Sequence, residues 1–348
     1  MKLKTQKTLL VSSFVITTLG LTACGGDSTA EGGSTTKDVP TAAQVVITEE
    51  NSEEVASEVI SAVQGAEGVS EITTDLPIGV QIQTSGITLP PVTEIVSQSL
   101  QWIDLSKLSF QKIPVGVSVN ETVPCDSGSL TLSGNVSDNG DMSAGDSLTI
   151  EANSCNLYGS TLNGNMSVDV ISYSDSYSKM ELSYSDFSIT YSDYYDGGIS
   201  IQIPNLNGVA ETWGDLYWGD IEKMIVSSTG QYFAEYGSDK MSASMNNFVT
   251  SVEFVGAEER ITYDGLIQST VNGQTLGALD IETLQPMVWT YYGDYPASGQ
   301  LKVYGAQGRL RLTANGDATV QVETDADEDG VYEVTQDINW DDLGSEIL

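Results

Sequence analysis

The fold is decided by stretches such as Met166-Ser167-Val168-Asp169-Val170, in which apolar and polar residues alternate without a break. A period of two places successive side chains on opposite faces of a β-strand, so that one face is dry and the other is wet. The same alternation recurs from about Val115 onward, at Val117/Val119, Leu130/Leu132, Leu148/Ile150, Ile199/Ile201/Ile203, Leu301/Val303, Leu310/Leu312 and Val320/Val322. We therefore expect residues 113–348 to form an antiparallel β body.

Turn-forming dipeptides punctuate this region, because Asn-Gly and Asp-Gly tolerate the positive φ that tight hairpin turns require. They stand at Asn139-Gly140, Asn163-Gly164, Asp196-Gly197, Asn207-Gly208, Asp264-Gly265, Asn272-Gly273, Asn315-Gly316 and Asp329-Gly330. A flat sheet of more than about ten strands is unusual. We expect a long meander of short strands, curled into a barrel-like or half-barrel sheet, with a sandwich as the alternative. Strands of this length disfavour an outer-membrane barrel.

Two segments within residues 46–112 show helical spacing and complete a mainly β, α+β fold. The first has Asn51 or Ser52 as N-cap and an apolar face formed by Val55, Val59, Ile60 and Val63. The second begins at Pro91 and spaces Ile95, Val96, Leu100, Ile103 and Leu108 like a helix. Since both are amphipathic, we expect both helices to pack on the sheet.

The N-terminus has the pattern of an export signal. A basic start is followed by an apolar run from Leu9 to Leu21, too short to span a bilayer, and by Leu21-Thr22-Ala23-Cys24. The last four residues resemble the lipobox of bacterial lipoproteins. That resemblance implies cleavage of a signal peptide at residues 1–23 and lipidation of Cys24, which anchors the chain to a membrane. Residues 24–45 then form a flexible linker of about 25 Å.

The residue after Cys24 bears on the destination of the protein. In Gram-negative lipoproteins, Asp at that position is the usual signal for retention in the inner membrane, and this chain has Gly25. By analogy, the resemblance favours the outer membrane over the inner membrane.

Charge and composition exclude some classes of function. Removal of residues 1–23 leaves 10 basic residues against 49 acidic ones, a formal charge of −39. The few cations are scattered, so we expect no nucleic-acid partner. The chain has no histidine, which excludes Ser-His-Asp and Cys-His centres. We expect no enzymatic activity, although a hydrolase based on two carboxylates stays open as an alternative.

Two cysteines remain after the lipid site, Cys125 and Cys155, and an even pair in an exported chain predicts a disulfide. They lie at equal sequence distances from Gly140. Gly140 is part of a polar segment that is flanked by two strand-like stretches. We therefore expect a hairpin in which the two cysteines face each other. A reactive dithiol is the less favoured reading, because a C-x-x-C spacing is absent.

The segment Asp325-Ala326-Asp327-Glu328-Asp329-Gly330 matches the first half of an EF-hand calcium loop. Its twelfth position is Gln336 rather than Glu, and the flanking residues alternate like strands. The segment therefore resembles the D-x-D-x-D-G loops that bind calcium at hairpin turns in secreted bacterial proteins. The resemblance implies a structural Ca²⁺ with oxygen ligands from Asp325, Asp327, Asp329, the backbone near Val331, and Glu333. A solvated acidic turn is the alternative.

Tyrosines are concentrated in near-repeats such as Ser172-Tyr173-Ser174-Asp175 and Ser183-Tyr184-Ser185-Asp186. Aromatic rows on a sheet can bind glycans or hydrophobic partners, which makes Tyr173, Tyr184 and Tyr191 candidate ligand-facing residues. Cross-strand packing is the more common role of such residues, and we favour it.

Three motifs carry a wider resemblance: Cys125 to Ser129 with Gly145-Asp146-Ser147-Leu148 and Cys155; Tyr295 to Leu301; and the final D-x-D-x-D-G-Val-Tyr-Glu segment followed by Trp340. Together they resemble uncharacterised envelope lipoproteins and secreted proteins of proteobacteria, which implies no established activity. We expect a lipid-anchored, non-enzymatic binding or scaffold protein whose partner is a protein, a glycan or a hydrophobic ligand. The alternative is a periplasmic carrier, since a curled sheet that holds helices is similar to lipoprotein carriers.

Overall fold

The architecture was obtained as a computed structural model. The structure describes residues 43–63, 66, 117–123, 125–136, 143–157, 160–191, 199–215, 220–236, 239–271, 277–290 and 293–344. All of them belong to one compact unit, Lys37–Leu348. Its strands are β1 (Val117–Val123), β2 (Ser127–Val136), β3 (Ser147–Leu157), β4 (Ser160–Ser174), β5 (Tyr177–Tyr191), β6 (Ile199–Asp215), β7 (Asp220–Tyr236), β8 (Asp239–Val255), β9 (Glu258–Val271), β10 (Leu279–Thr290), β11 (Ser298–Tyr304), β12 (Arg309–Ala314), β13 (Thr319–Asp325) and β14 (Val334–Asn339).

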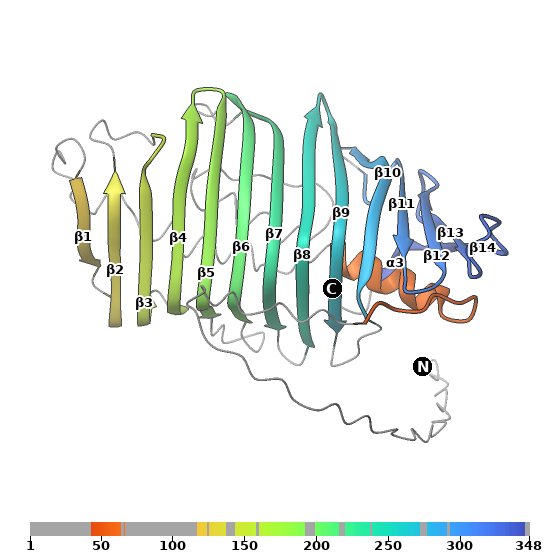
Figure 1. Cartoon of the computed structure of the whole chain (residues 1–348), viewed down its shortest axis with the longest axis horizontal. Helices are drawn as coiled ribbons and strands as arrows, with labels where there is room; N and C mark the ends of the chain where they lie inside the picture. The colour runs from red at the N-terminus through yellow and green to blue at the C-terminus, as the bar shows by residue number, and fades with distance from the viewer. Residues whose placement is uncertain are drawn as a thin grey trace, which may run out of the picture. The chain divides into compact units, whose positions relative to one another are not determined.

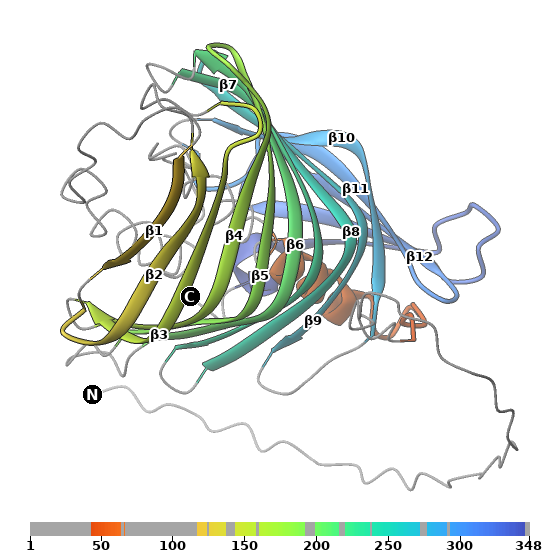
Figure 2. The ribbon, with the colours of Figure 1, turned by 60° about the vertical axis from the view of Figure 1, so that its left-hand side comes forward.

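The strands form one antiparallel meander in which every strand pairs with its neighbours in sequence (Figure 1). The order runs from β1 to β14 without a crossover, and the sheet is open, because β1 and β14 are its two ends. Figure 2 shows that the sheet curls instead of lying flat. The predicted mainly β fold, a long antiparallel meander with a curled sheet, is confirmed.

The expectation of short strands is wrong for the central part of the sheet. Strands β4 to β9 contain 14 to 17 residues each. Three predicted turns lie inside these long strands: Asn163-Gly164 in β4, Asn207-Gly208 in β6 and Asp264-Gly265 in β9. Asn315-Gly316 and Asp329-Gly330 do connect strands, as predicted. The remaining dipeptides, Asn139-Gly140, Asp196-Gly197 and Asn272-Gly273, lie outside the described residues.

Two of these three glycines, Gly164 and Gly265, lie at β-bulges that interrupt the pairing of the long strands. Opposite Gly164 the register shifts, and β5 inserts an extra residue there, with Asp186 at φ 48°. Opposite Gly265 the extra residue is on β8, with Asn247 at φ 52°. A bulge bends its strand and increases its twist while the strand continues. Residues that favour positive φ therefore curve the sheet at positions where the sequence pattern predicted that strands would end.

These bulges bring backbones of adjacent strands unusually close. A Cβ atom on Gly164 would lie 2.1 Å from the backbone oxygen of Asp186, and one on Gly265 would lie 2.6 Å from that of Asn247. Gly128 and Gly230 approach the neighbouring strands in the same way. Glycine is required at such positions because it has no Cβ and tolerates positive φ.

The core consists of one face of the sheet together with the helix over residues 52–63. Along β12 burial alternates strictly, and the buried side chains of β12, such as Leu310 and Leu312, join the same apolar cluster as those of the other strands. The helix contributes its predicted face, since Val55, Val59, Ile60 and Val63 are all buried in that cluster. This predicted helix is confirmed, whereas the one expected from Pro91 lies outside the described residues.

The start of the 52–63 helix and its position are set by polar contacts. The carbonyl of Asn51 accepts the first helical hydrogen bond, from the amide of Val55 (2.9 Å), which makes Asn51 the N-cap. The Ser57 hydroxyl donates to the carbonyl of Leu343 (2.7 Å), in a short helix after β14, α3 (Trp340–Gly344). The helix therefore packs at the C-terminal end of the sheet. None of the helices within the described residues has the length and apolar character needed to cross a membrane.

Candidate metal centre

The acidic segment predicted from the sequence forms the connection between β13 and β14. Asp325 is the last residue of β13, and β14 begins at Val334. The pairing of the two strands holds the ends of the connection together, with Thr324 opposite Val334. The hairpin thus brings the acidic residues of the connection close together. The two helices that flank the loop of an EF-hand are replaced here by the paired strands β13 and β14.

Four of the predicted ligand residues meet in this connection. One carboxylate oxygen each from Asp325, Asp327, Asp329 and Glu333 lies within 4.8 Å of the others. Asp325 is 1% exposed, and its Oδ1 atom is buried without a hydrogen-bond partner. A buried, unpartnered carboxylate oxygen is costly. The cluster could therefore hold a metal ion, which would supply the missing partner.

Hydrogen bonds from backbone amides orient the four carboxylates of the cluster. Asp327 Oδ1 accepts a hydrogen bond from the amide of Asp329 (3.2 Å), and Asp329 Oδ1 accepts one from the amide of Val331 (2.7 Å). Asp325 Oδ2 accepts from the amide of Gly330 (3.2 Å). Glu333 reaches back to the amide of Ala326 (3.2 Å). These local turns fix the loop, and the predicted ligand residue Val331 takes part through its amide.

Two residues that the sequence pattern did not single out complete the surroundings of the cluster. Arg309, opposite Asp325 in the β12–β13 pairing, places one guanidinium nitrogen 3.8 Å from Asp325 Oδ2 and another 3.9 Å from Glu328 Oε2. Glu328 also accepts a hydrogen bond from the amide of Gly308 (3.1 Å). Glu328 thus turns away from the four carboxylates and ties the loop to the β11–β12 turn. No local sequence signal reveals this tie, because the partners are about twenty residues apart.

A second arginine on β12 supports the far side of the loop. Arg311 binds the Glu323 carboxylate with two hydrogen bonds (2.6 and 2.5 Å), and its guanidinium lies 4.2 Å from the centre of the Tyr332 ring. The hydrogen bond to Glu323 raises the pKa of Arg311. Desolvation raises the pKa of the Tyr332 hydroxyl. The stacked arginine and tyrosine hold the returning arm of the loop against β12.

The chemistry of the donor set restricts the kind of cation. All four groups are carboxylates, and hard divalent cations such as Ca²⁺ and Mg²⁺ take oxygen ligands of this kind. Soft metals prefer thiolate and imidazole ligands, and the chain has no histidine.

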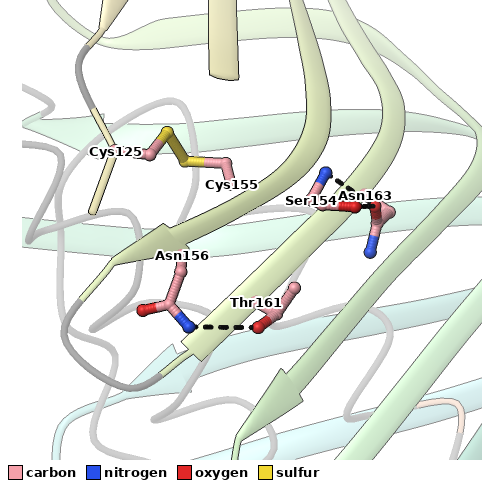
Figure 3. Close-up of a disulfide and its surroundings, with 6 residues drawn as sticks. All are labelled: Cys125, Ser154, Cys155, Asn156, Thr161 and Asn163. Carbon is pink, nitrogen blue, oxygen red and sulfur yellow. Dashed lines mark hydrogen bonds between the residues drawn. A yellow bond between two sulfur atoms is a disulfide. The ribbon is translucent and has the colours of Figure 1, made fainter. Parts of the chain in front are cut away.

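The Cys125–Cys155 disulfide predicted from the sequence is present, with a Cα–Cα distance of 5.4 Å (Figure 3). The symmetric register proposed for its hairpin is wrong, because Leu130 lies opposite Ala152 instead of Ile150. Cys125 precedes β2, and Cys155 sits at a bulge in β3 beside Ser154, whose φ is 48°. The bulge inserts an extra residue into β3. The disulfide therefore joins two cysteines that are not register partners in the β2–β3 pairing.

Hydrogen bonds to β4 stabilise this bulge. The amide of Ser154 donates to Asn163 Oδ1 (2.7 Å), and Asn156 Nδ2 donates to the hydroxyl of Thr161 (3.3 Å), as Figure 3 shows. Cys155 is fully buried and belongs to the apolar core. The surroundings match a structural disulfide.

The three candidate ligand-facing tyrosines do not form one exposed row. Tyr184 is 3% exposed and packs edge-on against Phe187, with ring centres 5.6 Å apart. Its burial raises the pKa of its hydroxyl. Tyr173 is half-buried near one end of β4, and Tyr191 is the last residue of β5. Tyr184 is therefore a core residue, in agreement with the packing role that we favoured.

Cys24, the predicted lipidation site, lies outside the described residues. Comparisons with protein-family models, with curated proteins and with solved structures found no match to this chain.

Proposed function

We propose that this protein is a lipid-anchored protein of the bacterial envelope, with a non-enzymatic binding or scaffold role and a β body stabilised by calcium. The observation that carries the proposal is the carboxylate cluster at the β13–β14 connection, where Asp325 is buried with one oxygen unpartnered. The export signal and the lipobox-like residues before Cys24 support the location.

Calcium fits the cluster better than magnesium does. Three Asp and one Glu stand on a short hairpin connection, and calcium accepts flexible oxygen cages with six to eight ligands, whereas magnesium demands near-ideal octahedral geometry and retains its water. Backbone oxygen near Val331 and water would complete the coordination. Single sites of this kind in extracellular modules bind calcium with dissociation constants of about 0.1–1 mM.

A calcium titration followed by thermal and urea unfolding tests the proposal. With a dissociation constant of about 1 mM, 10 mM CaCl₂ stabilises the folded state by about 1.4 kcal/mol. This corresponds to a rise of about 3–6 °C in Tm for a domain of this size. MgCl₂ at the same concentration should give a smaller shift. An absent calcium shift, or an equal shift with magnesium, would refute the calcium site.

Matched variants assign the effect to the cluster. The double variant Asp327→Asn, Asp329→Asn keeps the oxygens that accept the amides of Asp329 and Val331 but removes two ligand charges. It should lose the calcium shift. The control Asp341→Asn, Asp342→Asn removes the same charge from α3, where Asp341 accepts from the Tyr295 hydroxyl, and it should keep the shift.

Lipid attachment is tested separately by metabolic labelling with palmitate. The wild-type chain should carry the label and fractionate with membranes, and Cys24→Ser should lose both properties. An unlabelled wild-type product would refute the anchoring part of the proposal and leave the calcium part untouched.

A further inference from the structure

Residues 43–47 lie against the β11–β12 turn through backbone contacts. The amide of Ile47 donates to the carbonyl of Gln307 (2.8 Å), and the amide of Ala306 donates to the carbonyl of Val45 (2.6 Å). The approach requires glycine in the turn, since a Cβ on Gly308 would lie 2.3 Å from the carbonyl oxygen of Ile47. Ile47 itself is 1% exposed. Residues 43–47 are the first residues that the structure describes, so this contact lies next to the predicted linker to Cys24.

The same turn also contacts the connection between β13 and β14, residues 325–333, which we call the metal loop. The amide of Gly308 donates to Glu328 Oε1 (3.1 Å), and Arg309 lies between Glu328 and Asp325. The carbonyl of Gln307 and the amide of Gly308 belong to one peptide group. That rigid, planar group therefore accepts a hydrogen bond from the N-terminal segment at one end and donates one to the metal loop at the other.

We propose that the Gln307–Gly308 peptide couples the metal loop to the docking of residues 43–47, so that bound calcium strengthens the attachment of the N-terminal segment to the sheet. This inference rests on the calcium site proposed above. The coupling would place a calcium-dependent clasp at the point where the chain leaves the β body toward its lipid anchor.

The physical basis is the charge of the loop. Four carboxylates within 4.8 Å repel one another when no cation is bound, and the buried Asp325 has an unpartnered oxygen. Repulsion favours opening of the loop, which withdraws Glu328 from the Gly308 amide. A bound divalent cation removes the repulsion, keeps Glu328 in place and holds the shared peptide. Hydrogen bonds at the two ends of one peptide also polarise and strengthen each other.

Hydrogen–deuterium exchange of the mature, full-length chain tests the coupling. With 10 mM CaCl₂, peptides covering residues 326–333 and residues 43–50 should both exchange more slowly, the latter by about fivefold or more at Ile47, as is typical of coupled sites. At exchange times too short for global unfolding to contribute, peptides from β4 and β5, far from the turn in the strand order, should not change.

The variant Glu328→Asn isolates the connection. Asn tolerates the positive φ of this position (64°) and is too short to retain the bond to Gly308, while the four clustered carboxylates stay intact. Calcium should still protect residues 326–333 of the variant but no longer protect residues 43–50. The control Asp175→Asn removes one charge from the exposed turn between β4 and β5 and should behave like wild type.

The outcomes separate the two proposals. Protection of the loop without protection of residues 43–50 in the wild type overturns the clasp and leaves the calcium site standing. Continued protection of residues 43–50 in Glu328→Asn also overturns the clasp, because the effect would not pass through Glu328. Absence of protection in the loop itself overturns both proposals.

Discussion

The substitution Gly164→Ala is expected to destabilise the protein strongly, because this glycine allows a bulge inside β4 and β5. Gly164 has φ +90°, and a Cβ placed on it would lie 2.1 Å from the backbone oxygen of Asp186. An ordinary van der Waals contact begins at 3.4 Å, so the two backbones must separate by about 1.3 Å. Any such separation works against the pairing of two 15-residue strands in the centre of the sheet.

Two contributions make up the expected loss. A non-glycine residue in this region of φ costs about 1–3 kcal/mol of backbone strain. Forcing a methyl group into a closely packed place adds about 1–3 kcal/mol. Gly145→Ala is a matched control, because Gly145 has φ +93° and a Cβ there would meet no atom within 4 Å. The control carries only the strain, so the two variants should differ by about 1–3 kcal/mol.

Equilibrium urea unfolding followed by tryptophan fluorescence measures this difference. Both variants should unfold at lower urea concentration than the wild type, and Gly164→Ala should unfold first. In thermal unfolding the two Tm values should differ by roughly 2–12 °C, at about 2–4 °C per kcal/mol. Equal midpoints for the two variants would show that the Asp186 carbonyl moves away without cost, and would refute the role of Gly164 in holding the bulge.

Three further predictions concern the disulfide, the charged outer face and the buried tyrosine. Replacing Cys125 and Cys155 by serine should lower the unfolding free energy by about 3–4 kcal/mol from the chain entropy of the opened loop, as a shift of the urea midpoint would show. Desolvation raises the pKa of Asp264 and of Asp280 above 3.8, with further contributions from nearby Glu282. Folded protein then binds more protons than unfolded protein in the window just above pH 3.8, so these groups reduce stability as the pH rises through it. Asn at either position should stabilise the protein at pH 7 and have no such effect at pH 3, and unfolding curves at the two pH values check this. Tyr184→Phe removes a buried hydroxyl without a partner and should leave stability unchanged or raise it by about 1–3 kcal/mol, whereas a clear loss in urea unfolding would contradict that burial.

The parts of this fold that the sequence predicted are those determined by local pattern. Alternation of apolar and polar residues found the strands, and helical spacing found the buried face formed by Val55, Val59, Ile60 and Val63. The carboxylate cluster at the β13–β14 connection was also predictable, because a hairpin connection brings together acidic residues that are close in sequence. Each of these predictions depends only on residues within one element or one turn.

The features of the fold that the sequence did not predict depend on pairing between strands. Asn163-Gly164 has the same local preference as Asn315-Gly316, yet the first is part of a bulge and the second ends a strand. Both uses require positive φ, and the difference lies in whether the neighbouring strand continues past the glycine, which a single segment cannot reveal. The same reasoning applies at the candidate metal centre. Glu328 looks like one more acid of the loop, and only the register of β12 against β13 places Gly308 and Arg309 beside it. In a long meander, where each strand has two neighbours, the functional meaning of a residue is therefore set by its position across the sheet as much as by its position along the chain.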